Sequence, residues 1–138
     1  MRCLPVVLLI PLAFVLTTCS GKESAPSTQN ETPTVERLVD QVPAGVEGVE
    51  LAKDGLRAKK GYRFVKDSDT TFAIMRMNDR RVVGYGGCGC WVGVGCIPLE
   101  APGGIWVCHQ FPGCINCGLA VTPIGGVRTE IFRYTKKG

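Results

Sequence analysis

Six cysteines and the chain's single histidine lie in one short segment, residues 87–118, which reads "GCGCWVGVGCIPLEAPGGIWVCHQFPGCINCG". Six thiols this close together must be cross-linked, bind a metal or carry out redox chemistry. Apart from these cysteines, residues 87–118 contain few features that would fix their structure. Between Val82 and Val127 only Glu100 is formally charged, and twelve of the eighteen glycines lie there. The compartment in which the chain folds therefore decides what the sulfurs do.

The amino terminus has the layout of a secretory signal. Met1 and Arg2 give it a positive start, and Leu4 to Leu16 follow without a charge. Wound as a helix, this apolar stretch covers about 20 Å, which falls short of the roughly 30 Å hydrocarbon layer of a membrane. We therefore expect residues 1–18 to be a signal peptide and not a stable membrane span.

The leader ends in Leu16-Thr17-Thr18-Cys19, an apolar residue and two small residues before a cysteine. This resembles the lipobox of bacterial lipoprotein precursors, a resemblance that covers residues 1–20 only. It implies that the Cys19 thiol carries a diacylglycerol and anchors the mature chain to a membrane. Thr18 departs from the Gly, Ala or Ser that the family prefers, so cleavage without lipid is the alternative. Ser20 in place of aspartate implies the outer membrane or cell surface, facing the periplasm or the exterior.

Residues 19–33 are expected to form a tether between the lipidated cysteine and a folded domain. From Ser20 to Pro33 there is no large apolar residue, so this segment cannot bury enough surface to offset its ordering entropy. A flexible chain of this length spans about 20 Å. The remaining residues, 34–138, are sufficient for a single domain with a hydrophobic core.

The charge of the chain is uneven. Residues 53–81 carry nine basic and four acidic side chains, whereas residues 19–52 carry two basic and six acidic ones. A basic segment is one requirement for binding nucleic acid. No nucleic-acid-binding motif accompanies it here, so we expect a solvated face of strands and no nucleic-acid partner.

Periodicity predicts a mainly β domain with one short N-terminal helix. Thr32 caps this helix and Pro33 is its first residue, while its apolar face holds Val35, Leu38, Val39 and Val42. Residues 45–55 have no clear assignment. Five strands are predicted, the first three as a small antiparallel meander, at residues 61–66, 70–77, 80–87, 105–110 and 129–134. The last of these places Glu130, Phe132 and Tyr134 on one side.

Disulfides are the first interpretation of the late cysteines. Without Cys3 and Cys19, six remain: Cys88, Cys90, Cys96, Cys108, Cys114 and Cys117. In an exported protein an even number favours three bridges, whose fifteen possible connectivities the sequence leaves open. If residues 88–96 are extended, the first three cysteines share a face with Val92 and Val94, and Trp91 points away. Their partners then come from the last three cysteines. We expect Trp91, Trp106, Ile105 and Phe111 to pack across these bridges, and an exposed aromatic binding surface is the alternative.

A metal centre is the alternative interpretation. The run Cys114-Ile115-Asn116-Cys117-Gly118 has the Cys-x-x-Cys-Gly form of zinc ribbons and rubredoxin-like sites. With Cys88 and Cys90 it would supply four thiolates for zinc or a 2Fe-2S cluster, in a protein of electron transfer or metal handling. Cys96 and Cys108 would then bridge each other.

A second alternative is a thiol–disulfide oxidoreductase that uses Cys114 and Cys117 as its redox pair. Such pairs begin a helix, and the sequence from Gly118 to Pro123 is a poor start for one. His109 follows Cys108 and is expected to face solvent from a strand.

Hydrolytic acid–base chemistry lacks its parts, because the cysteine-rich half holds one carboxylate before Glu130. We therefore expect no catalytic residue. Under the disulfide interpretation no cofactor is needed. The chain is then an exported, lipid-anchored binding or structural module of the cell envelope, with a ligand or partner that the sequence does not identify.

Overall fold

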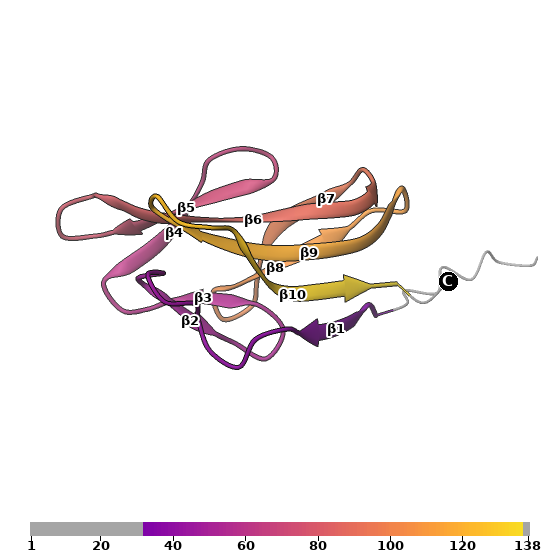
Figure 1. The fold of residues 1–138 in the computed structure, drawn as a ribbon, viewed down its shortest axis with the longest axis horizontal. Helices are drawn as coiled ribbons and strands as arrows, with labels where there is room; N and C mark the ends of the chain where they lie inside the picture. Colours follow the sequence, from indigo (N-terminus) through magenta and orange to yellow (C-terminus); the bar gives the residue numbers. More distant parts are fainter. Residues whose placement is uncertain (1–31, 137–138) are drawn as a thin grey trace, which may run out of the picture.

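The structure is a computed structural model that describes residues 32–136, all of which lie in strands, turns and connecting segments (Figure 1). The predicted signal peptide, Cys19 and almost all of the tether lie outside the described residues. The ten strands are β1 (Thr34–Arg37), β2 (Val49–Leu51), β3 (Leu56–Ala58), β4 (Tyr62–Lys66), β5 (Thr71–Arg76), β6 (Val82–Gly93), β7 (Cys96–Ala101), β8 (Ile105–Gln110), β9 (Cys114–Pro123) and β10 (Thr129–Thr135). The mainly β prediction is confirmed. Within residues 32–136 no helix is long and apolar enough to cross a membrane.

The strands form two antiparallel sheets. The larger has the order β1-β10-β9-β6-β5-β4, and the smaller has the order β2-β3-β8-β7. The meander predicted from the sequence is confirmed as β4, β5 and β6, which pair in succession. Side chains from both sheets meet in one core cluster, whose fully buried members include Leu56, Phe72, Ile74, Leu119, Ile131 and Phe132.

The two longest strands, β6 and β9, run side by side along the molecule (Figure 1). Their pairing extends from Gly84 opposite Pro123 to Gly93 opposite Cys114. Glycine in β6 makes room for the core, because a Cβ on Gly86 would lie 2.1 Å from the Phe72 ring. That ring packs between Phe64 and Trp106, with centroids 4.8 and 4.9 Å away. The glycine-rich sequence therefore permits a strand that aromatic packing holds in place.

The predicted N-terminal helix is wrong. Its first residues form β1, in which Thr34 lies opposite Thr135 and Arg37 opposite Phe132. The edge of β10 has unpaired backbone groups that a strand satisfies and a helix does not. Three apolar positions of the helical pattern still pack against the core cluster, Val35 from β1 and Val39 and Val42 from the segment that follows it. Tertiary pairing overrides the local periodicity here.

The segment without a predicted structure, residues 45–55, contains β2 and the turn into β3. Asp54-Gly55 at this turn is a known hairpin signal, and it could have located the pair of strands. Gly55 is required because a Cβ there would lie 2.3 Å from the Trp106 carbonyl oxygen. The Tyr134 hydroxyl donates a hydrogen bond to the Asp54 carbonyl at 2.7 Å, and burial raises the pKa of this phenol. The contact ties the small hairpin to the larger sheet.

A polar cluster attaches the segment before β2 to the β4–β5 pair. The Glu47 carboxylate accepts hydrogen bonds from the Tyr62 hydroxyl at 2.5 Å and from Arg76 Nη2 at 2.7 Å. These bonds lower the pKa of Glu47, and the same carboxylate raises the pKa of Tyr62. Arg76 also donates to Asp79 at 3.0 Å. All four side chains are partly or largely exposed, so the cluster orients the chain more than it stabilises the fold.

β10 departs from the predicted alternation. Its pairing with β9 shifts register between Glu130 and Phe132, which is the signature of a β-bulge. As a result Ile131 and Phe132 are both fully buried, although they are neighbours in the chain. The bulge allows β10 to contribute two consecutive side chains to the core.

Candidate functional site

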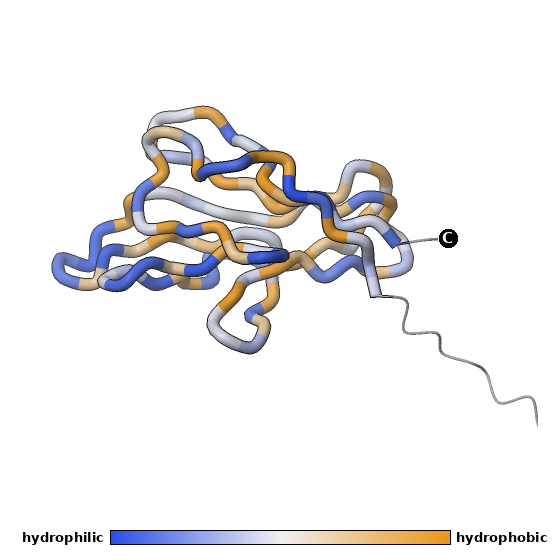
Figure 2. Tube along the Cα trace, turned by 90° about the horizontal axis from the view of Figure 1, so that it is seen from below, coloured by the Kyte–Doolittle hydropathy of each residue, from blue (hydrophilic) through white to orange (hydrophobic). Residues whose placement is uncertain are grey.

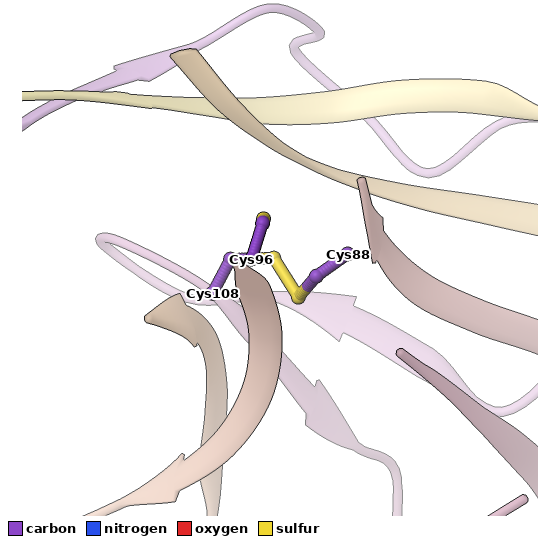
Figure 3. Close-up of side chains that lie close together, drawn as sticks. All are labelled: Cys88, Cys96 and Cys108. Carbon is purple, nitrogen blue, oxygen red and sulfur yellow. A yellow bond between two sulfur atoms is a disulfide. The ribbon is translucent and has the colours of Figure 1, made fainter. Parts of the chain in front are cut away.

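The structure joins all six late cysteines in three disulfides. Cys88 is bonded to Cys108, Cys90 to Cys114, and Cys96 to Cys117, with Cα atoms 5.7, 5.7 and 5.6 Å apart. Figure 3 shows the first of these bonds, with Cys96 beside it. Each bridge links a cysteine of residues 88–96 to one of residues 108–117, and neighbours such as Cys88 and Cys90 have different partners. This is the division that the alternation of side chains indicates.

Two of the bridges connect the sheets. The first joins Cys88, in β6 of the larger sheet, to Cys108, in β8 of the smaller sheet. The second joins Cys96, in β7 of the smaller sheet, to Cys117, in β9 of the larger sheet. The third bridge, Cys90–Cys114, lies within the larger sheet between β6 and β9. The disulfides therefore fix the distance between the sheets as well as the pairing of strands.

The stretch from Cys88 to Cys96 does not form one extended strand, which was the condition for placing all three of its cysteines on one face. The chain turns at Gly93 and Gly95, whose φ angles are +91° and +103°. A Cβ on Gly93 would also lie 2.0 Å from the Gly113 carbonyl oxygen. The turn carries the chain from the larger sheet to the smaller one, and it leaves Val92 and Val94 exposed.

The metal and redox interpretations require sulfur pairings that differ from those in the structure. A four-thiolate site at Cys88, Cys90, Cys114 and Cys117 would have left Cys96 bonded to Cys108, but these two have other partners. Cys114 and Cys117 are not bonded to each other either. The one cluster of metal-ligating side chains within residues 32–136, Cys88, Cys96 and Cys108, has its sulfurs within 4.8 Å of one another (Figure 3). All three are in disulfides, which leaves no thiolate to act as a ligand.

An open pocket of about 400 Å³ lies on the larger sheet, beside the Cys90–Cys114 disulfide. It is lined by Gly89, Cys90, Trp91, Arg128 and Glu130. A smaller hollow of about 120 Å³ shares Arg128 with it and is also lined by Thr70, Tyr85 and Thr122. Arg128 therefore stands between two adjoining depressions, which we call the Arg128 face.

Paired glycines form the floor of the Arg128 face. Gly89 in β6 lies opposite Gly118 in β9. A Cβ on Gly89 would lie 2.9 Å from Arg128 Nη2, and one on Gly118 would lie 2.6 Å from Glu130 Oε1. Because neither glycine has a side chain, the arginine and the glutamate lie flat against the sheet.

The charges on this face are unequally compensated. Glu130 Oε1 accepts hydrogen bonds from Trp91 Nε1 at 3.3 Å and from Arg133 Nε at 3.4 Å. The Arg133 guanidinium also lies 5.1 Å from the centre of the Trp91 ring, a cation–π contact. Among the residues that the structure describes, Arg128 forms no hydrogen bond or ion pair. Its guanidinium is therefore available to an anionic group.

Arg128 was not predicted from the sequence, and the aromatic residues were predicted only in part. Trp106 packs against the core as expected, but Trp91 is 61% exposed and Phe111 is 42% exposed. The alternation Tyr85, Gly87, Gly89, Trp91 along β6 was the available signal for an outward face with two aromatic side chains and no bulk between them. His109 is exposed on β8, as predicted.

A comparison of the chain with protein families, curated proteins and solved structures finds no match. The features of this chain that bear on its function are the leader, the disulfides and the Arg128 face.

Proposed function

We propose that the protein is an exported, lipid-anchored module of the bacterial cell envelope that binds an anionic ligand on its Arg128 face. The three disulfides carry this proposal, because such bridges form and persist outside the reducing cytoplasm. The signal-like leader and the lipobox resemblance of residues 16–19 support export and lipidation of Cys19.

The chemistry of the Arg128 face favours a carboxylated sugar as its ligand. An unpaired guanidinium forms strong, paired hydrogen bonds with a carboxylate. The exposed Trp91 ring offers an apolar surface beside it, and the threonine and tyrosine hydroxyls of the smaller hollow offer polar partners. Envelope polysaccharides that carry uronic acids combine these features.

Intact mass spectrometry of the protein purified from envelopes tests export, lipidation and cross-linking together. We expect a mature chain that begins at Cys19, carries the added mass of a lipid and is six hydrogens lighter than the reduced chain. Bound zinc or iron with free thiols after metal removal would contradict the disulfide module. A chain with its leader intact would contradict export.

We expect Arg128→Gln to weaken binding of an alginate tetrasaccharide by about tenfold or more, because hydrogen bonds to a charged group are each worth about 1.5–3 kcal/mol. Titration followed by Trp91 fluorescence or by calorimetry measures the affinity. Arg57→Gln is the control, since Arg57 is an exposed arginine on the smaller sheet. Unchanged affinity in Arg128→Gln, or equal binding of the neutral maltotetraose, would refute the assignment of this face.

A further inference from the structure

Four exposed apolar side chains lie at one end of the molecule, at the end of β6, at the start of β9 and in the two turns beside them. Val92, Val94, Phe111 and Ile115 are 61, 78, 42 and 60% exposed, and we call them the apolar tip. Val92 lies opposite Ile115 in the β6–β9 pairing. The other two residues come from the β6–β7 turn and the β8–β9 turn. Exposed apolar side chains on neighbouring segments of a small domain can mark an interaction site.

The apolar tip is held rigidly. The Val94 amide donates to the Gly113 carbonyl at 3.2 Å, and the Phe111 amide donates to the Gly95 carbonyl at 2.7 Å. The Cys90–Cys114 disulfide lies at the base of the same turns. Residues 91–99 and 110–123 contain no formally charged side chain. The turns therefore present apolar groups that cannot fold back into the core.

The tip lies where the described chain begins. Thr34, the first residue of β1, lies opposite Thr135 of β10. The Thr135 hydroxyl bonds to Asn116 Oδ1 at 3.2 Å, and Asn116 is the neighbour of Ile115. In Figure 1 the start of β1, the end of β10 and both turns are at the right-hand end. In Figure 2 the β5–β6 turn at the opposite end is strongly hydrophilic, whereas the β9–β10 turn exposes Ile124 and Val127.

We propose that the apolar tip docks into the lipid surface that carries the Cys19 anchor. This rests on the lipid anchoring proposed above. Only fourteen residues separate Cys19 from Thr34, and the tether predicted from the sequence spans about 20 Å. Because the tether joins the domain beside the tip, the tip reaches the membrane without any extension of the tether. Lys136, exposed at the end of β10, adds a cation at the same end for phosphate headgroups.

A second copy of the chain is a weaker occupant for this surface. Stable protein interfaces use roughly 20–30 residues from each partner. Four side chains on two adjoining turns are far fewer than that. They suit shallow insertion among lipid headgroups, where contact with acyl chains requires no matching surface.

Quenching of tryptophan fluorescence by brominated phosphatidylcholine tests the docking on the full mature protein in vesicles. Trp91 is exposed and precedes Val92 of the tip in the chain, whereas Trp106 packs against the core and serves as an internal reference. We expect the brominated lipid to quench the fluorescence of the natural protein strongly. The Trp91→Phe variant should show no quenching, and in Val94→Asp the extent of quenching should fall at least threefold. The matched control is Val127→Asp, because Val127 is 82% exposed in the β9–β10 turn, at the other end of both strands.

The outcomes separate the docking from the anchor. If intact mass shows lipid on Cys19 but Trp91 is not quenched, the docking is refuted and the anchor stands. If no lipid is found, the anchor fails, and quenching of the unlipidated chain at millimolar lipid decides the docking by itself. Equal quenching in Val94→Asp and the natural protein refutes it. The docking is also refuted if sedimentation shows that the natural protein is a dimer and that Val94→Asp is a monomer, because the tip would then bind a second copy of the chain.

Discussion

Reduction of all three disulfides is expected to remove more than half of the free energy of unfolding, and to leave the domain largely unfolded at 37 °C. Each bridge closes a loop, with sequence separations of 20, 24 and 21 residues. Loops of this size are each worth about 3 kcal/mol, against a total stability of about 5–15 kcal/mol for a typical domain. Because the three loops overlap, their contributions are not expected to add fully. Urea titration with and without a phosphine reductant, followed by circular dichroism, measures the loss.

Paired variants separate the bridges between sheets from the bridge within a sheet. Cys96→Ala with Cys117→Ala is expected to cost more than Cys90→Ala with Cys114→Ala. The first pair removes a covalent link between the two sheets and leaves a cavity at Cys117, which is fully buried. The second pair removes a link between strands that backbone hydrogen bonds already hold together. An unfolding midpoint that reduction does not change would contradict the role we assign to these bonds.

Phe72→Ala is expected to lower the free energy of unfolding by about 3–5 kcal/mol, the usual cost of removing a buried phenyl ring. The Phe72 side chain is fully buried, and its ring contacts Phe64, Trp106 and the backbone of Gly86. These contacts come from both sheets, so the remaining side chains cannot collapse into the space without moving one sheet. Urea unfolding at constant pH gives the value. Phe111→Ala is the matched control and should cost less than 1 kcal/mol, because Phe111 is exposed.

The contact between Phe72 and Gly86 can be tested from its other side. Gly86→Ala alone is expected to destabilise by about 1–3 kcal/mol, because the new methyl group and the ring would occupy the same space. With Phe72→Ala already present the methyl group has room. The double variant should therefore cost clearly less than the sum of the single variants. Strict additivity would show that the ring does not lie over this glycine.

Strands that carry their own hydrophobic pattern could be predicted from the sequence. The segments of β4, β5, β8 and β10 alternate or are rich in β-branched and aromatic residues, and the structure has them within one or two residues of the expected bounds. The β9 strand was missed, because Cys114–Pro123 combines a Cys-x-x-Cys-Gly turn pattern with small residues. Its pairing with β6 and β10, and not its own propensity, makes it a strand.

The Arg128 face and the apolar tip could not be predicted from the sequence, because both depend on which distant segments meet in the fold. Arg128 follows a turn with no periodicity, and its importance depends on Gly89, which is 39 positions earlier in the chain. Val92 and Ile115 each look like core residues in a local window. They are exposed because the glycine turns at 93–95 end the strand before the core does.

The sequence by itself determined the chemistry that the fold must accommodate: an even set of six late cysteines, a glycine-rich segment almost without charge, and a chain organised mainly by strands. Only the tertiary structure decided which sulfurs bond, that β1 is a strand and where the exposed surfaces lie. The physical reason is that composition and local periodicity act over a few residues. Disulfide geometry, edge pairing and exposure depend on which distant backbones meet, and that is settled only when the two sheets pack.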